Sequence, residues 1–238
     1  MDNIAPEDFA IIHGDAIEVL ETIYPGSVAG FIADPPYCSG GRQQAGARNT
    51  ISKNVRRDED WFLGDQMGSD TYIWWMRQIA KRCLVACQPG GYAYCFTDWR
   101  QYSTVTAAWE SSGWTLRGVV VWDKDRGGAM GSFWRNNHEW IAVFVKGKPR
   151  PLPNHSFFNT WRGAKPQGGF HPTEKPIGLI EYLVSSITPV GGLIVDPFAG
   201  SGVTGIAALR QGFRFLGIEL NPGYVSAARQ RMLDEVTR

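Results

Sequence analysis

The stretch IVDPFAGSGVTG, residues 194–205, decides the fold. An apolar run leads into a glycine-rich turn and a helix-like segment, and a second apolar run, residues 213–218, ends at Glu219. Gly200, Gly202 and Gly205 have the G-x-G-x-x-G spacing of nucleotide-binding turns, in which an acid after the next strand holds ribose hydroxyls. This spacing alone equally fits a nicotinamide oxidoreductase. The preceding residues 196–198, Asp-Pro-Phe, are atypical of nicotinamide sites and favour a nucleoside cofactor without a pyrophosphate.

The rest of the chain alternates short apolar runs with amphipathic stretches, a pattern typical of a parallel sheet covered by helices on both faces. We expect strands at residues 10–12, 28–33, 92–96, 193–195 and 213–218, with 114–122 and 140–146 as a later pair. We expect helices at residues 15–23, 71–87, 99–111, 176–187, 203–211 and from 222 to the C-terminus. A length of 238 residues then predicts a single α/β domain, doubly wound, over 1–238.

Composition excludes several classes of protein. Hydrophobic residues make up 43% of the chain and ten are Trp, which argues against disorder. No apolar run follows a basic N-terminus and none reaches membrane-spanning length, so a cytoplasmic protein is expected. Four cysteines are too few for a disulfide framework, and no Cys/His set has zinc spacing, which predicts reduced thiols and no metal site.

The stretch GFIADPPY, residues 30–37, is an apolar strand that ends in a carboxylate, two prolines and an aromatic. Open α/β sheets bind ligands at the carboxyl ends of their strands. Asp34 and the Pro35 carbonyl form a pair of acceptors for the two hydrogens of a nucleobase amine, and Tyr37 can stack on the base. A strand that simply ends in a proline-rich turn, here through Pro36, is the alternative reading.

Together these segments resemble the amino-methylating DNA methyltransferases that use S-adenosylmethionine. The order of the motifs, with D-P-P-Y about 160 residues before F-x-G-x-G, resembles the β group of that family, and residues 171–176 (HPTEKP) match its motif ahead of the glycine loop. The resemblance implies a circularly permuted methyltransferase fold in which strand 193–195 lies beside strand 31–33. It covers nearly the whole chain except the loops.

The resemblance also implies roles for individual residues. Asp34, Pro35, Pro36 and Tyr37 would be catalytic, with Asp34 also near the cofactor. Glu219 would hold the cofactor ribose. The other residues implied in cofactor binding are Asp15, Thr173, Lys175, Asp196, Phe198, Ala199, Gly200, Ser201 and Gly202.

Three of these assignments leave alternatives open. Asp15, matched to a position near the cofactor adenine, also fits a helix N-cap. Lys175, expected with Thr173 near the methionine carboxylate, also fits a phosphate contact or a surface lysine at a helix start. Asp196 either orients the glycine loop or meets the cofactor's amino group.

Residues 38–69, 123–137 and 147–172 have neither helical nor strand periodicity, and long loops of this kind are usually functional or mobile. The net charge of +1 hides two basic stretches, the first and third of these loops. If the chain is a member of this family, these two loops would contact DNA phosphate. Basic surface loops are also often merely solvated. The candidate DNA contacts are Arg42, Arg48, Lys53, Arg56, Arg57, Lys148, Arg150, Arg162 and Lys165. Residues 147–172 are the candidate target-recognition segment.

The resemblance implies methylation of a flipped base in a short DNA sequence. D-P-P-Y, as opposed to S-P-P-Y, favours the N6 amine of adenine in this family. Methylation of cytosine N4, of RNA or of a protein amine stays open, as does a DNA-binding module without catalysis. The resemblance to this family also suggests two protein partners, a second copy of the chain in a homodimer and a cognate restriction endonuclease.

Overall fold

The computed structural model describes residues 8–38, 67–125, 134–154, 156–166 and 174–237. Within these ranges one mixed sheet has the strand order β1-β8-β7-β2-β3-β5-β4-β6. Its strands are β1 (Phe9–His13), β2 (Val28–Ala33), β3 (Cys87–Thr97), β4 (Thr115–Asp123), β5 (His138–Val145), β6 (Thr160–Arg162), β7 (Leu193–Asp196) and β8 (Arg214–Glu219). The helices are α1 (Ala16–Glu21), α2 (Ser69–Ala86), α3 (Tyr102–Glu110), α4 (Ile177–Val184), α5 (Val203–Arg210) and α6 (Pro222–Val236).

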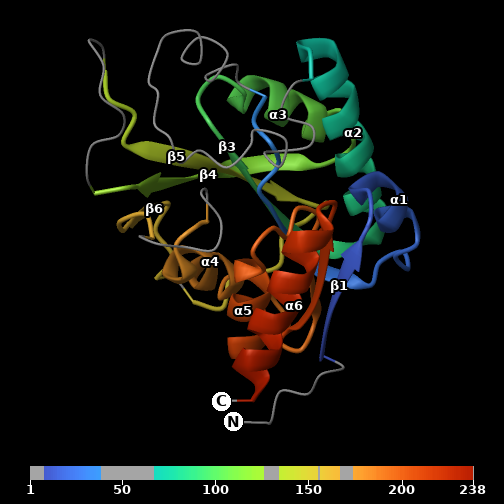
Figure 1. Ribbon diagram of the computed structural model, residues 1–238. Helices are drawn as coiled ribbons and strands as arrows, with labels where there is room; N and C mark the ends of the chain where they lie inside the picture. Colours follow the sequence, from blue (N-terminus) through green and yellow to red (C-terminus); the bar gives the residue numbers. More distant parts are fainter. Residues whose placement is uncertain (1–7, 39–66, 126–133, 155, 167–173, 238) are drawn as a thin grey trace, which may run out of the picture.

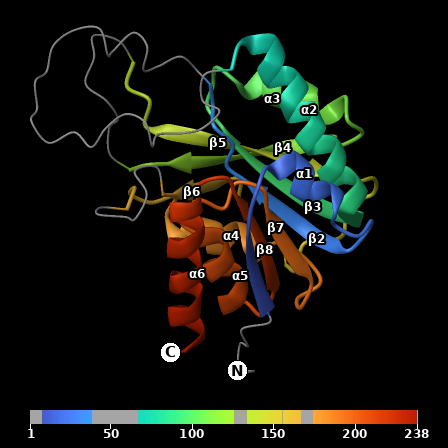
Figure 2. The same cartoon turned by 45° about the vertical axis from the view of Figure 1, so that its right-hand side comes forward.

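Helices cover both faces of the sheet, α1, α2 and α3 on one side and α4, α5 and α6 on the other (Figures 1 and 2). The alternation of side chains along a strand explains the two layers. In β2, Phe31 and Ala33 pack into the core beneath α1 to α3, whereas Ile32 packs with the helices of the opposite face. Among the described residues, no helix combines the length and the apolar character that crossing a bilayer requires.

The strand order confirms the permuted arrangement that the resemblance implied. β7 lies parallel to β2, with Phe31 opposite Val195, so the D-P-P-Y strand and the glycine-loop strand are neighbours. From this pair the chain continues in opposite directions, through α5 to β8 and through α2 to β3. Such a reversal opens a crevice at the carboxyl ends of the strands. The fold therefore places a ligand site beside Asp34 and Asp196.

The far half of the sheet departs from a simple parallel order. β5 runs antiparallel to both β3 and β4. β6, with only three residues, pairs in parallel with β4 through Asp123 and Arg162. We expected residues 147–172 to be loop throughout, and the structure corrects this, since β6 adds a short strand at the edge of the sheet.

Candidate active site

The carboxyl ends of β7, β2 and β8 surround a cavity of about 370 Å³. It brings together most of the residues singled out in the sequence. Those that line it are Asp15, Asp34, Pro35, Pro36, Tyr37, Lys165, Lys175, Asp196, Phe198, Ala199, Gly200, Ser201 and Glu219. Thr173 lies outside the described residues.

The Asp196 carboxylate holds the glycine loop by hydrogen bonds at both ends of the loop. One oxygen of the carboxylate accepts from the Phe198 N–H at 2.9 Å, and the other accepts from the Thr204 hydroxyl at 2.6 Å. Gly202 is the N-cap of α5 with φ +78°, and a Cβ there would lie 2.9 Å from Met232 Cε, so this position needs glycine. A Cβ at Gly200 would meet nothing nearer than 3.8 Å. Open space therefore lies beside the backbone at Gly200, which lines the cavity.

The contacts of Asp196 favour the loop-orienting role over a direct contact with the cofactor. Burial raises the pKa of this carboxyl to about 7, although its hydrogen bonds with Thr204 and the Phe198 N–H act in the opposite direction. A raised pKa in the folded protein means that protonation stabilises the fold. This stabilisation is complete below the ordinary pKa of an aspartate, about 4, and is lost as the pH rises through about 7.

We therefore predict that wild-type protein loses stability between about pH 4 and pH 7 relative to an Asp196→Asn variant. Denaturant unfolding of both proteins at several pH values in this range measures the difference. A difference in unfolding free energy that stays constant with pH would contradict the assignment.

Glu219, at the end of β8, has both carboxylate oxygens fixed by backbone. It accepts from the Gly200 N–H at 2.9 Å and from the Asn221 N–H at 2.8 Å. The carboxylate lines the cavity and keeps free lone pairs for ribose hydroxyls. Asp15 accepts from the Ile17 N–H at 2.8 Å and so caps α1, while also lining the cavity. The structure thus supports the N-cap reading without removing Asp15 from the ligand site.

This donor set fits the cofactor implied by the resemblance. Ile218 and Leu220 give the cavity apolar walls for an adenine ring. Phe198 also lines it, supported by Trp75 at a ring-centroid distance of 5.4 Å. Glu219 supplies acceptors for a ribose diol, and the open side of Gly200 admits a chain close to the backbone.

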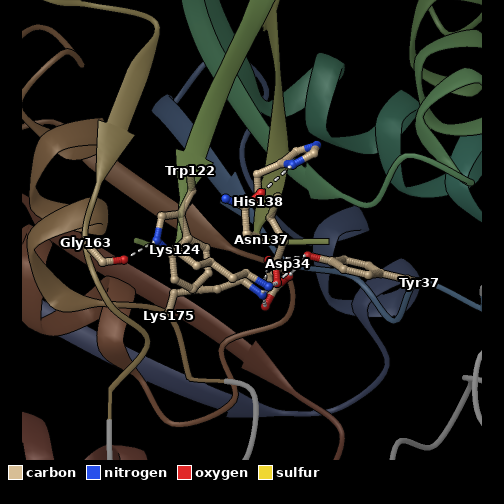
Figure 3. A network of polar contacts seen from close by, with 9 residues as sticks. Asp34, Tyr37, Trp122, Lys124, Asn137, His138, Gly163 and Lys175 are labelled. Carbon is tan, nitrogen blue, oxygen red and sulfur yellow. Dashed lines mark hydrogen bonds and ion pairs between the residues drawn. The ribbon is translucent and has the colours of Figure 1, made fainter. Parts of the chain in front are cut away.

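A charged cluster occupies the other end of the cavity (Figure 3). The Lys175 ammonium lies 2.8 Å from Asp34 Oδ2 and 3.2 Å from Glu139 Oε2. The Tyr37 hydroxyl lies 3.1 Å from Asp34 Oδ1 and 3.1 Å from Glu139 Oε2. Lys124 completes the cluster at 2.6 Å from Glu139 Oε1.

The two carboxylates of this cluster differ in their proton affinity. Burial raises the pKa of Asp34 above its usual value, and the nearby Lys175 only partly offsets this. Burial acts in the same direction on Glu139, but Lys175 and Lys124 outweigh it and lower the pKa of Glu139 to about 2. Burial alone would lower the pKa of Lys175, yet Asp34 and Glu139 raise it. Glu139 and Lys175 thus stay charged, whereas Asp34 is the group more ready to take up a proton.

Two residues differ from the expectations of the sequence. Lys175 is buried, with 6% exposed, and its ammonium is paired with Asp34 and Glu139, so the structure gives no support to a surface lysine. A buried ammonium requires such anionic partners. The Tyr37 hydroxyl points to Asp34 (Figure 3), so this side chain forms a polar contact with the Asp34 carboxylate that the sequence did not predict.

Sequence reasoning missed the side chains on the far half of the sheet. Glu139 and Trp122 are cross-strand partners in β5 and β4, and both line the cavity. Lys124 follows β4 and lies 5.1 Å from the Trp122 ring centroid. An acid at the start of an apolar strand was the available signal for Glu139, but only the register of β4 against β5 brings it to Asp34.

The predicted DNA contacts separate into three groups. Arg162 and Lys165 lie at the same edge of the sheet as the cavity, with Arg162 exposed and paired to Asp123 and Asp125 at 3.1 Å each. Lys148 and Arg150 instead lie at the amino end of β3, about 20 Å away along the strand. The basic residues Arg42, Arg48, Lys53, Arg56 and Arg57 are outside the described residues.

Arg150 lies far from the cavity and bonds to other parts of the protein. Its guanidinium donates to the Thr188 carbonyl at 2.7 Å and to Gln88 Oε1 at 2.9 Å, and its backbone N–H bonds to Gly90. These contacts tie down the chain at the end of the sheet opposite the cavity. Arg150 therefore has a structural role at that end of the sheet, and neither it nor Lys148 lines the cavity.

Comparisons with known proteins agree with this geometry. A family model described as DNA methylase (N6_N4_Mtase) matches residues 28–230. The protein YubD of Escherichia coli K12 is 31% identical over 227 residues, covering 93% of this chain and 88% of YubD. The same organism's DNA adenine methyltransferase YhdJ is 25% identical and covers 93% of this chain and 82% of YhdJ.

Solved structures share the fold. TTHA0409 of Thermus thermophilus, complexed with S-adenosylmethionine, has a TM-score of 0.72 at 22% identity and covers 96% of this chain and 94% of its own. The cytosine-N4-specific PvuII DNA methyltransferase has a TM-score of 0.71 at 16% identity and covers 97% of this chain and 92% of its own.

Proposed function

This chain belongs to the N6/N4 DNA methylase family, and from that premise we propose that it methylates the exocyclic N6 amine of adenine in a short DNA sequence, with S-adenosylmethionine as the methyl donor. The observation that carries the proposal is the Asp34 carboxylate, which lies in the same cavity as the glycine loop. The aspartate in D-P-P-Y and the similarity to a DNA adenine methyltransferase favour adenine over cytosine.

Asp34 and the Pro35 carbonyl are the acceptors for the two hydrogens of the target amine. Accepting both hydrogens favours a pyramidal nitrogen whose lone pair is available for attack. Positioning of this kind supplies much of the rate of a group transfer. After transfer the nitrogen is cationic and loses a proton, and Asp34 is the acceptor because its pKa is raised while that of Glu139 is lowered.

The cofactor, when bound, supplies an electrophilic methyl group on a sulfonium. Glu219 would accept hydrogen bonds from its ribose, Phe198 and the loop around Gly200 would hold its methionine part, and Asp15 would lie near its adenine. The hydrogen bonds of Asp196 keep this loop in place from beneath. Thr173 stays a proposed contact on the strength of the family motif alone.

The DNA would approach the edge of the sheet where the cavity opens. Arg162 is an exposed cation at this edge, and Lys165 lines the cavity itself. The basic residues of 39–66 stay proposed phosphate contacts. The target base has to leave the duplex to reach Asp34, at a cost of about a few kcal/mol.

Incubation of unmethylated duplex DNA with cofactor labelled in its methyl group tests the proposal. After digestion to nucleosides, we expect the label in N6-methyladenine. Label found in N4-methylcytosine and absent from N6-methyladenine would identify the enzyme as a cytosine-N4 methyltransferase. An RNA oligonucleotide of the same sequence serves as the second substrate, and preferential labelling of the RNA would overturn the assignment to DNA.

A further inference from the structure

Both oxygens of Asp34 already have partners inside the protein. Oδ2 is paired with the Lys175 ammonium at 2.8 Å, and Oδ1 lies 3.1 Å from the Tyr37 hydroxyl. A target amine that donates to Oδ1 has to displace that hydroxyl. The displaced O–H then needs another acceptor, because a donor left unsatisfied in a partly buried site is costly.

Glu139 offers that acceptor without any movement of the backbone. Its Oε2 atom lies 3.1 Å from the Tyr37 hydroxyl, the same distance as Asp34 Oδ1. The hydroxyl has one hydrogen and faces two carboxylates, so it donates to one or the other. Glu139 also holds Lys175 at 3.2 Å and is fixed in turn by Lys124.

We propose that Glu139 is a positioning residue for methyl transfer: it accepts the Tyr37 hydroxyl and shares the Lys175 ammonium when the target amine binds, which frees Asp34 for the amine. This rests on the proposed function. Glu139 itself touches neither of the reacting atoms. Its effect reaches the amine mainly through the Tyr37 hydroxyl.

The charges around Asp34 support this division of roles. The titratable groups near it come from the D-P-P-Y turn, β3, β5, β7 and the segments after β4 and β6 and before α4. They are Tyr37, Cys95, Lys124, Glu139, Lys165, Lys175 and Asp196. Lys175 and Lys124 lower the pKa of Glu139 to about 2, so it remains an ionised acceptor at neutral pH.

A double-mutant cycle between Glu139→Gln and Tyr37→Phe tests the proposal. We expect Glu139→Gln to lower kcat for DNA methylation about 10- to 100-fold, because the displaced hydroxyl loses its anionic acceptor. In the Tyr37→Phe background there is no hydroxyl to displace, so the same substitution should have an effect smaller by about fivefold or more. KM for the cofactor should stay near the wild-type value in each variant.

Glu110→Gln is the matched control, since Glu110 is exposed on α3 and away from the cavity. It should retain wild-type kcat, and thermal unfolding of each variant shows that the fold is kept. A Glu139→Gln enzyme within about twofold of wild type would overturn the proposal. So would equal effects of Glu139→Gln in the Tyr and Phe backgrounds, since Glu139 would then not act through the hydroxyl.

A second readout needs neither DNA nor cofactor. The negative charge of Glu139 raises the pKa of Asp34, so Glu139→Gln should lower the Asp34 pKa in a carbon-13 NMR titration of the free protein. The acid limb of the kcat profile should move to lower pH in parallel. An unchanged Asp34 titration contradicts the role of Glu139, whereas absence of methylation by wild-type protein contradicts the proposed function.

Discussion

Replacing Asp34 with asparagine should lower the rate constant of methyl transfer about 100- to 1000-fold, the range typical of losing one preorganised electrostatic contact in an active site. Asparagine has nearly the shape of aspartate but no charge, and only one of its two terminal atoms accepts hydrogen bonds. The NH₂ group cannot accept from the target amine. The neutral side chain also gives no stabilisation to the positive charge that develops on the nitrogen.

Single-turnover assays with saturating cofactor and unmethylated DNA measure this rate constant. Lys175 keeps Glu139 as an anionic partner in this variant, so the fold should survive, which thermal unfolding checks. Asp70→Asn, at an exposed position in the first turn of α2, is the matched control and should transfer at the wild-type rate. An Asp34→Asn enzyme within about threefold of wild type would remove Asp34 from the catalytic role.

Replacing Glu219 with glutamine should weaken cofactor binding about 10- to 100-fold, since hydrogen bonds to a charged group contribute about 1.5–3 kcal/mol. The carboxylate also fixes the glycine loop, because it accepts hydrogen bonds from the N–H groups of Gly200 and Asn221. Glutamine has one acceptor oxygen in place of two. It therefore leaves a backbone donor, a ribose hydroxyl or both without a charged partner.

Calorimetric titration with S-adenosylhomocysteine measures this loss, with Glu110→Gln as the control. An analogue that lacks both ribose hydroxyls separates the two contributions. If Glu219 binds the ribose, the ratio of affinities between wild type and Glu219→Gln should be much smaller for the analogue. Equal ratios for the two ligands would show that Glu219 acts on the loop alone.

The sequence was sufficient to predict the features that local patterns determine, which include every strand of the sheet except β6. The glycine turn after β7 and the D-P-P-Y turn after β2 each combine an apolar strand with residues of restricted backbone geometry, and both lie where they were expected. The pairing of β7 with β2 was predicted from the family's strand order. All these features are local, or are set by the order of the motifs along the chain.

The remainder depends on pairing between distant segments. β6 has three residues, too few for strand periodicity to be visible. Glu139 reaches Asp34 only through the antiparallel register of β4 and β5. Arg150 was grouped with DNA-binding residues by local charge, which carries no information about the end of the sheet at which a residue lies. Its hydrogen bonds to Thr188 and Gln88 show that it lies at the end opposite the cavity.

Single-base mapping of modified bases in the genome of a methylase-free host that expresses this chain tests the central claim most directly. We predict N6-methyladenine at the copies of one short sequence, and its absence from cells that express the Asp34→Asn variant at the same level. Modification confined to N4 of cytosine, or a genome without methylated bases despite folded wild-type protein, would contradict it.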